Sequence, residues 1–171
     1  MYLMMGTHSD IAFAVLWASP AMDWPTEADW IGVECTLKYL WGMSNYGSLY
    51  WAGNSKGVLE AFSNPDLAGD VRTRPSTSGA LAVYAGSAIA WSSQLQRSVA
   101  LSTTEAEFIA PSEGAKKLLW LKCLLGELSG KCSEVPTLYV ENTSTVKLMK
   151  NPEFHKQWKH IEVWYYFVRE C

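Results

Sequence analysis

Acidic and amide side chains occur at the ends of expected strands and within expected helices. Asn64 and Asp66 close a strand-like run, Glu107 lies in the first turns of a long helical pattern, and Glu141 ends the run LYVE. Glu162 lies in the last helical run. Oxygen ligands brought together in this way suit hard divalent cations. Two such cations roughly 3.5–4 Å apart can stabilise both oxygens of a phosphoryl transfer. The pattern therefore indicates a metal-dependent hydrolytic site, provided that the fold brings these residues together.

Each of these residues also has a structural interpretation. Thr104-x-x-Glu107 satisfies the capping-box pattern, as does the equivalent pair ending at Glu105, so either glutamate could close a helix start. Asp66 lies among turn-forming residues, and Glu141 could simply end a strand. Single histidines such as His155 and His160 are more often surface or core residues than ligands or acids. Lys116 and Lys117 could belong to a solvated helix face. Periodicity alone leaves both interpretations open.

The elements that would position these residues change in type along the chain. Residues 1–50 are predicted to be helical: Ser9 or Asp10 could cap a first helix, and Thr26 precedes a second one that ends at Gly42. An apolar stripe at helical spacing supports the second helix. Residues 51–171 have short strand-like runs followed by alternating helix and strand. We therefore expect two parts, 1–50 and 51–171.

The second part predicts an α/β fold with a mixed sheet. GSLYWAG and GVLEAFSN are expected to form one hairpin, and GALAVYAG and AIAWSS a second one around Gly86. A long helix, the strand PTLYVEN, a short helix stopped by Pro152 and a final helical run follow. Strands followed by alternating helix and strand imply a mixed sheet with helices on its faces.

Composition limits the classes of protein that fit. The 171 residues are 49% apolar and 18% charged, a globular balance, and the net charge is -3. This charge gives no general basic surface, so nucleic-acid binding would need a local patch. The four cysteines form no CxxC pair, and no apolar run approaches the roughly 20 residues of a membrane span. We expect a soluble intracellular protein with free thiols and no membrane partner.

Long stretches of the chain resemble a known family. The run TRPSTSGALAVYAGSAIAWSSQLQRSVALSTTEAEFIAPSEGAKKLLWLKCLLGEL is similar to the ribonuclease H domain of copia-type LTR retrotransposon Pol polyproteins, as is LYVENTSTVKLMKNPEFHKQWKHIEVWYYFVRE. YLMMGTHSDIAFAV resembles the segment that joins the reverse transcriptase to that domain. The matching stretches follow in order over nearly the whole chain.

The resemblance implies a ribonuclease H-like fold: a five-stranded mixed sheet flanked by helices, preceded by a helical remnant of the reverse transcriptase region. It implies Mg²⁺- or Mn²⁺-dependent hydrolysis of RNA in an RNA–DNA hybrid. The implied catalytic positions are Asn64, Asp66, Glu107, Glu141 and Glu162, of which all but Asn64 would be metal ligands. The implied substrate contacts are Arg72, Arg74, Ser76, Ser78, Asn142, His155 and His160.

The chain departs from the family's motifs at the implied catalytic positions. Asn64 stands where the family has its first aspartate, and Glu141 and Glu162 stand where it has aspartates; Glu107 is retained. An amide lacks the charge that attracts a divalent ion, and a misplacement of about 1 Å can cost ~100-fold in rate. Asp66 is a candidate substitute ligand, although Pro65 argues against regular strand geometry there. Pro111 inside the long helix costs roughly 3 kcal/mol.

These departures leave the present activity open. A ribonuclease H-like domain with weak or lost hydrolysis is one interpretation, and an active nuclease that uses Asp66 is another. A non-catalytic module that binds nucleic acid or protein is a third, and a decayed fragment without function is the fourth. The basic residues available for a local patch are Arg72, Arg74, Lys116, Lys117, Lys156 and Lys159.

Overall fold

The computed structural model describes residues 1–50, 57–66, 76–96, 103–129 and 135–150. The chain divides into two compact units, Met1–Leu49 and Tyr50–Cys171. We describe each unit by itself.

The first unit is helical. It contains α1 (Tyr2–Gly6), a 3₁₀ turn at Ser9–Ile11, α2 (Ala12–Ala18), a second 3₁₀ turn at Ser19–Ala21, and α3 (Glu27–Gly42). Thr26 caps α3 through a capping box: its Oγ1 accepts from the Asp29 amide at 3.3 Å, and the Asp29 carboxylate accepts from the Thr26 amide at 3.0 Å. The backbone N–H groups of Thr26 and Asp29 both find hydrogen-bond acceptors in this way. The helix start predicted at Thr26 is confirmed.

One expectation for the first unit is wrong. Neither Ser9 nor Asp10 caps a helix, because both lie in a 3₁₀ turn and α2 begins only at Ala12. The helix that the apolar stripe predicted is present as α3, although Trp30, Leu37 and Tyr39 of that stripe are exposed. Asp10 instead accepts a hydrogen bond from Tyr39 Oη at 2.7 Å. Desolvation acts to raise the pKa of Asp10, but this bond and the local backbone amides lower it overall.

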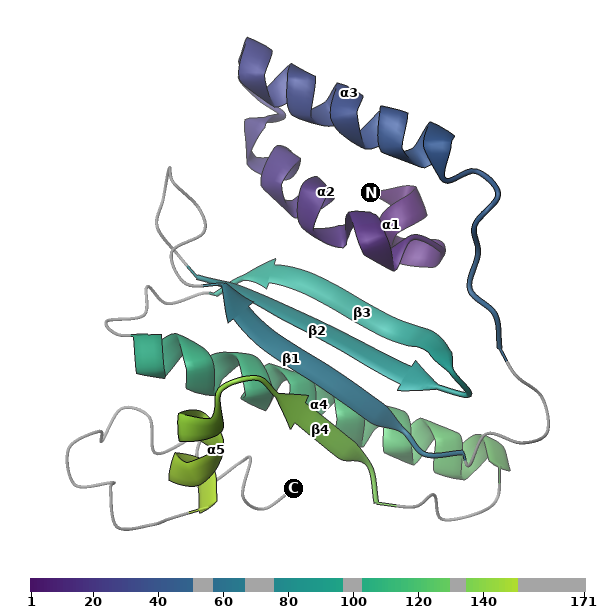
Figure 1. Ribbon diagram of the computed structural model, residues 1–171, viewed down its shortest axis with the longest axis vertical. Coiled ribbons are helices and arrows are strands. Elements are labelled where there is room, and N and C mark those ends of the chain that lie inside the picture. Colours follow the sequence, from purple (N-terminus) through teal and green to yellow (C-terminus); the bar gives the residue numbers. More distant parts are fainter. Residues whose placement is uncertain (51–56, 67–75, 97–102, 130–134, 151–171) are drawn as a thin grey trace. The chain divides into compact units, whose positions relative to one another are not determined.

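The second unit is built on a mixed four-stranded sheet. Its strands are β1 (Glu60–Asp66), β2 (Thr77–Tyr84), β3 (Ser87–Leu95) and β4 (Thr137–Val140), in the order β3-β2-β1-β4 (Figure 1). β1 pairs antiparallel with β2 and parallel with β4. The predicted β2–β3 hairpin is present. Its turn residues Ala85 and Gly86 have φ values of 53° and 82°, the left-handed pair that tight hairpins favour.

The sheet differs from expectation in two ways. Four strands are formed by the described residues, whereas the resemblance implied five. The hairpin expected between GSLYWAG and GVLEAFSN is wrong, because the described part of the first run, residues 47–50, forms no strand. β1 pairs with β2 along one edge and, over Glu60–Ser63, with β4 along the other. Tyr50 lies against β3 instead, with its hydroxyl donating to the Ala88 carbonyl at 2.7 Å.

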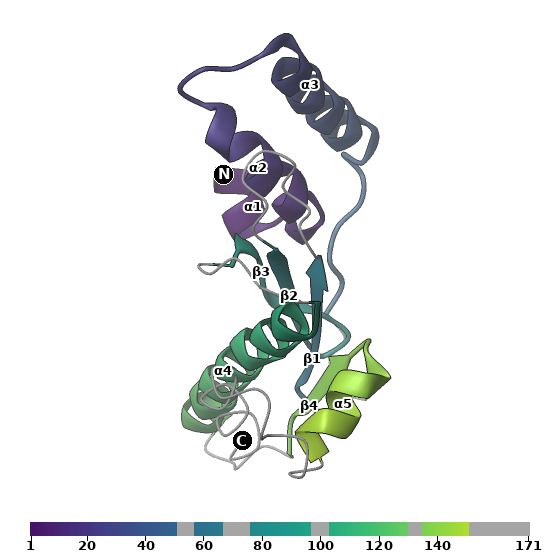
Figure 2. The ribbon, with the colours of Figure 1, turned by 90° about the vertical axis from the view of Figure 1, so that its left-hand side faces the viewer.

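One long helix covers one face of the sheet. α4 (Thr103–Ser129) lies along β1 and β2, and the short α5 (Thr143–Lys150) follows β4 (Figure 2). The core between them contains Leu59, Ala61, Ala82, Leu118 and Leu121. Burying such aliphatic side chains contributes roughly 1.5–3 kcal/mol each for the larger ones. This packing fixes α4 relative to the ends of β1 and β4.

Two residues of α4 govern how the helix meets the sheet. Gly114 approaches β1 so closely that an added Cβ would lie 3.2 Å from the Ser63 Cβ. Pro111 is buried inside the helix, which continues through it. Proline has no amide proton, so Pro111 cannot donate to the carbonyl of Glu107 four residues earlier. No helix in the described residues is long and apolar enough to cross a bilayer.

Candidate functional site

The ends of β1 and β4 bring Asn64 and Glu141 together. The two strands are parallel, with Ser63 paired to Val140, so the next residues along each strand emerge at the same edge of the sheet. Asn64 Nδ2 donates a hydrogen bond to Glu141 Oε2 at 2.7 Å. Both side chains are exposed. The first implied catalytic position is therefore an amide that donates to a carboxylate.

These two side chains lie on the face of the sheet that α4 does not cover. Side chains alternate along a strand, and Ser63 is buried against α4 near Gly114. The rings of Phe62 and Tyr139 stack on the same open face as Asn64, with centroids 5.0 Å apart. The Tyr139 hydroxyl donates to Glu60 at 3.0 Å, and this hydrogen bond raises the pKa of Tyr139.

Glu107 lies in a second group of polar side chains, between α4 and the start of α5. Glu107 Oε2 accepts hydrogen bonds from Thr145 Oγ1 at 2.9 Å and from Asn142 Nδ2. Asn142 Oδ1 in turn accepts from the Thr145 amide at 3.3 Å, which caps the start of α5. Hydrogen bonds from uncharged donors to a carboxylate are charge-assisted and stronger than neutral ones. Glu107 is therefore held by α5.

The two groups adjoin because Glu141 and Asn142 are consecutive in the chain. One carboxylate accepts from Asn64 and the other from Asn142 and Thr145. Within the described residues, no group of three His, Cys, Asp or Glu side chains could hold a metal ion. A divalent cation needs oxygen ligands, whereas the Asn64 side chain presents its NH₂ group to Glu141. This arrangement does not fit a two-metal centre.

Asp66 lies two residues beyond Asn64 on the same strand. β1 continues through Pro65, which is paired with Ser78, to Asp66, so the expectation of irregular strand geometry at Pro65 is wrong. The pairing with β4 reaches only Ser63, and beyond it the other edge of β1 has no partner strand among the described residues. Proline is tolerated on such an edge. Asp66 is exposed and alternates to the same face as Asn64.

The other implied residues fall into two classes. Ser76 and Ser78 are buried at the start of β2, and Ser78 Oγ accepts from Gln96 Nε2 at 2.9 Å. Asn142 lies between Glu107 and α5, as described above. The remaining implied residues lie outside the described residues: Arg72, Arg74, His155, His160 and Glu162.

Two residues of this region were not singled out from the sequence. Thr145 is fully buried and bonds Glu107, and Gln96 is buried and bonds both Ser78 and the Ala106 carbonyl. The signal for Thr145 was present in the sequence, since Asn142-x-x-Thr145 has the spacing of a cap residue and the third residue of a helix. No pattern in the sequence indicated that Gln96 would be buried and hydrogen-bonded.

Comparison with known proteins gives three informative similarities. Over 170 residues, 99% of this chain, it is 41% identical to the retrovirus-related Pol polyprotein from transposon TNT 1-94 of Nicotiana tabacum. Over 163 residues, 95% of this chain, it is 36% identical to the retrovirus-related Pol polyprotein from transposon RE2 of Arabidopsis thaliana. It is also 41% identical over 122 residues, 71% of this chain, to the secreted RxLR effector protein 161 of Plasmopara viticola.

The extent of these similarities differs between the relatives. The chain spans 13% and 11% of the lengths of the two Pol polyproteins, and 84% of the effector protein. No protein-family model and no solved structure matches the chain. Nearly every residue of the chain is nevertheless aligned with both Pol polyproteins at more than 30% identity. The chain therefore belongs to the family of copia-type retrovirus-related Pol polyproteins from transposons.

Proposed function

We propose that this chain is a ribonuclease H-like part of a retrotransposon Pol polyprotein, in which hydrolysis of RNA in RNA–DNA hybrids is weak or lost. Family membership supports the retroelement origin. The sheet supports the fold, since three antiparallel strands are followed by a helix and a parallel strand beside β1. In this proposal the first 50 residues are a helical remnant of the reverse transcriptase region.

The hydrogen bond from Asn64 to Glu141 is the observation that supports weak or lost hydrolysis. Two carboxylates at neighbouring strand ends would repel each other and attract a cation between them. Here an uncharged amide replaces one carboxylate and supplies a donor to the other at 2.7 Å. The negative charge at this edge is halved, and one oxygen of the remaining carboxylate, Glu141 Oε2, already accepts a hydrogen bond.

Mg²⁺ or Mn²⁺ is the cofactor that the family role requires, and the described residues do not fit it. Glu107 accepts from Asn142 and Thr145, and Glu141 accepts from Asn64. A cation would have to displace these donors and would gain one formal charge fewer than at a site with aspartate at position 64. Asp66 is the additional carboxylate nearest along the strand.

Cleavage of a labelled RNA–DNA hybrid tests this proposal. The natural chain, Glu107→Gln, Asn64→Asp, and the double variant that combines the two substitutions would be compared in Mg²⁺ and in Mn²⁺. We expect little or no cleavage by the natural chain, a gain in Asn64→Asp, and loss of that gain in the double variant. Rapid cleavage by the natural chain that Glu107→Gln abolishes would contradict the claim of weak activity. If Asn64→Asp does not cleave the hybrid, the claim that position 64 is the main defect is contradicted.

A non-catalytic nucleic-acid-binding module is the second candidate function. It is favoured by a lysine- and tryptophan-containing groove beside α4, which involves none of the implied catalytic residues. An RNA–DNA hybrid is the partner that the family role implies for the carboxylate site.

A further inference from the structure

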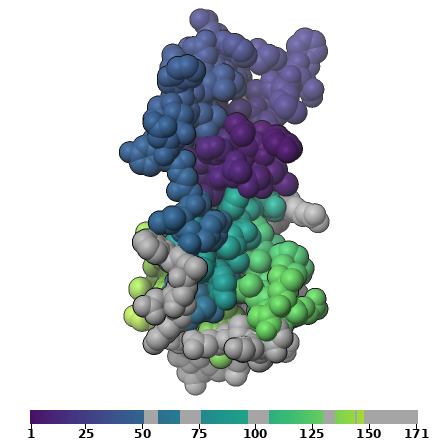
Figure 3. Space-filling model, turned by 90° about the vertical axis from the view of Figure 1, so that its right-hand side faces the viewer, coloured from purple at the N-terminus to yellow at the C-terminus, as the bar shows by residue number. Residues whose placement is uncertain are grey.

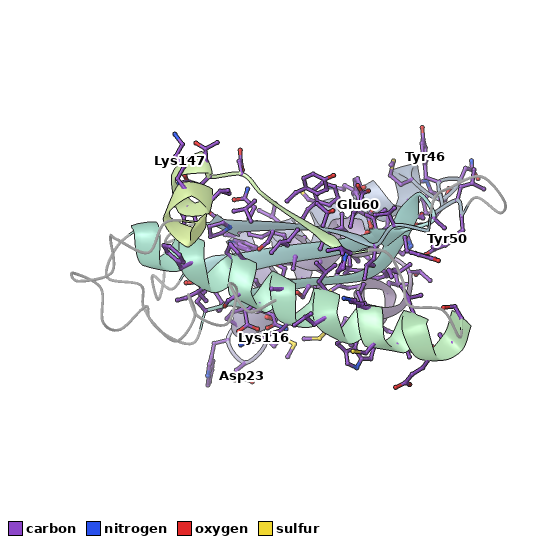
Figure 4. The ribbon with its side chains drawn as sticks, turned by 90° about the horizontal axis from the view of Figure 1, so that it is seen from below. Asp23, Tyr46, Tyr50, Glu60, Lys116 and Lys147 are labelled. Atoms are coloured by element: carbon purple, nitrogen blue, oxygen red, sulfur yellow. The ribbon has the colours of Figure 1, made fainter. Side chains whose placement is uncertain are left out.

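A groove of about 270 Å³ lies between α4 and the β2–β3 hairpin. The strands contribute Ser78, Ser92 and Gln94 to it, and α4 contributes Lys116, Lys117 and Trp120; we call it the Lys117 groove. β2 and β3 lie on the opposite side of β1 from β4, so the groove is separate from the Asn64–Glu141 contact. Figure 4 shows that Lys116 leaves α4 on the side away from Glu60 and Lys147.

The groove contains a lysine whose charge is poorly compensated. Lys116 forms an ion pair with Glu113, with Nζ 2.9 Å from Oε1. Lys117 is half-buried, and within the described parts of the chain no carboxylate lies within ion-pairing distance of it. Burial lowers the pKa of Lys117, and the more distant charge of Glu113 offsets this only in part. An anionic group in the groove would supply the missing counter-charge.

An exposed aromatic ring stands next to this lysine. Trp120 is 62% exposed, and it lies three and four residues after Lys117 and Lys116, so the three side chains share one side of α4. In the space-filling view, the green surface of α4 and the teal surface of the sheet lie side by side (Figure 3). Exposed aromatic rings beside cationic side chains bind single-stranded nucleic acids by stacking on their bases, irrespective of sequence.

The remaining lining consists of neutral side chains and of the Glu113 carboxylate, whose charge is paired with Lys116. Ser92 and Gln94 alternate to the same face of β3, opposite Ala80 and Ser78 of β2. Hydroxyl and amide groups of this kind commonly contact the sugar and phosphate oxygens of a nucleic acid. The groove volume lies just below the roughly 300–1,000 Å³ of small-molecule sites, which leaves room for one unpaired nucleotide unit.

We propose that the Lys117 groove binds a single-stranded nucleic acid, with a phosphate against Lys117 and a base stacked on Trp120. This inference rests on the second candidate function and adds to it the site and the class of ligand; it requires neither the carboxylates nor a cleaved strand. With a net charge of -3, the protein has no long-range attraction for phosphate. We therefore expect a dissociation constant on the order of 10⁻⁴–10⁻⁶ M, the usual range of sequence-independent binding.

Fluorescence anisotropy of a labelled deoxythymidine oligonucleotide tests the proposal, with the full chain in EDTA and over a range of salt concentrations. Lys117→Met removes the charge and keeps a long apolar stem. Trp120→Leu removes the ring at an exposed position. Lys122→Met is the matched control, since Lys122 lies on the same helix outside the groove lining. An equal-length duplex and inorganic phosphate serve as competitors, and a thermal unfolding curve checks that each variant is folded.

We expect Trp120→Leu to weaken binding by roughly 5- to 150-fold, the usual effect of losing one stacked base. Lys117→Met should reduce the slope of log K against log salt by about 0.7, the value for one phosphate contact on a single strand. Lys122→Met should bind like the natural chain, and the duplex should compete poorly. Unchanged binding in both groove variants, or no binding by the natural chain at low salt, would overturn the proposal.

Competition by inorganic phosphate distinguishes a nucleic-acid groove from a simple anion site. Phosphate that displaces the oligonucleotide completely at low millimolar concentration, with Trp120→Leu unaffected, would mean a simple anion site and would overturn the proposal. Because this assay contains no metal and scores no cleavage, failure of the hybrid-cleavage test leaves its outcome unchanged. Conversely, if the oligonucleotide does not bind in the groove, the increase in hybrid cleavage expected for Asn64→Asp is unaffected.

Discussion

Replacing Asn64 by aspartate should convert a stabilising contact into a repulsive one. Asn64 Nδ2 donates to Glu141 Oε2 at 2.7 Å, so the substitution removes this hydrogen bond and places a second carboxylate beside the first. Loss of the bond costs about 0.5–1.5 kcal/mol. Two unit charges that relax to about 4 Å apart repel by roughly 1 kcal/mol in water and about 4 kcal/mol at an effective dielectric constant of 20. Because both side chains are exposed, the lower figure applies.

The expected total for Asn64→Asp is therefore a loss of about 2 kcal/mol in the free energy of unfolding, with metal absent. For a chain of this size that corresponds to a fall of roughly 4–8 °C in the midpoint of thermal unfolding. Circular dichroism in EDTA measures this fall. In millimolar Mn²⁺ we expect the midpoint of Asn64→Asp to recover, because a ligand that binds only the folded state stabilises it.

Three control variants separate the contribution of the lost hydrogen bond from that of the charge repulsion. Asn64→Ala removes the hydrogen bond without adding charge, so it should lose less stability and should not respond to Mn²⁺. Glu141→Gln alone, and Asn64→Asp in the Glu141→Gln background, complete a double-mutant cycle whose coupling energy should be about 2 kcal/mol, the lost hydrogen bond plus the repulsion. A coupling energy near zero together with no response to Mn²⁺ would refute the juxtaposition of the two strand ends.

Three other perturbations test separate parts of the second unit. Pro111→Ala should raise the free energy of unfolding by about 1 kcal/mol, since a gain of roughly 3 kcal/mol in helix propensity exceeds the burial lost with two methylene groups; a decrease in urea-measured stability would contradict this. Thr145→Val should lower it by about 1.5–3 kcal/mol by removing the hydrogen bond to Glu107, whereas Thr145→Ser should lose only about 1 kcal/mol; equal losses would show that the hydroxyl is unimportant. Oligonucleotide affinity should fall as pH rises through the lowered pKa of Lys117, at a pH below the ordinary lysine value of 10.5. Over the same interval the stability of the natural chain should rise relative to Lys117→Met, because the folded state sheds that proton more readily than the unfolded state.

The predictable parts of the fold were those set by local chemistry. Thr26 and Asp29 have the spacing of a capping box, and α3 begins there. Residues with high strand propensity on both sides of Ala85 and Gly86 predicted the hairpin correctly. The run that begins at Gly47 also indicated a strand, but strand propensity says nothing about which edges of β1 are free.

The candidate site was only partly accessible from the sequence. The order of strands and helices implies that Asn64 and Glu141 emerge at neighbouring strand ends, because parallel strands share one edge. The direction of the Asn64 amide, which donates to Glu141, depends on local packing. The attachment of Glu107 to Asn142 and Thr145 likewise depends on where α5 lies against α4. These contacts between elements distant in the sequence have no periodicity from which they could be predicted.

The pairing of β1 with two strands so unequally distant in the chain has a consequence for the order of folding. β2 follows β1 directly, whereas Asn64 and Glu141 are 77 residues apart. At a ribosomal rate of roughly 5–20 residues per second, Glu141 is added about 4–15 s after Asn64. During that interval β1, β2 and β3 can pair while one edge of β1 stays open, which is the kind of edge on which chains aggregate. The contact between Asn64 and Glu141 therefore forms after the β1–β2–β3 pairing, and newly made chains are most prone to association just before β4 arrives.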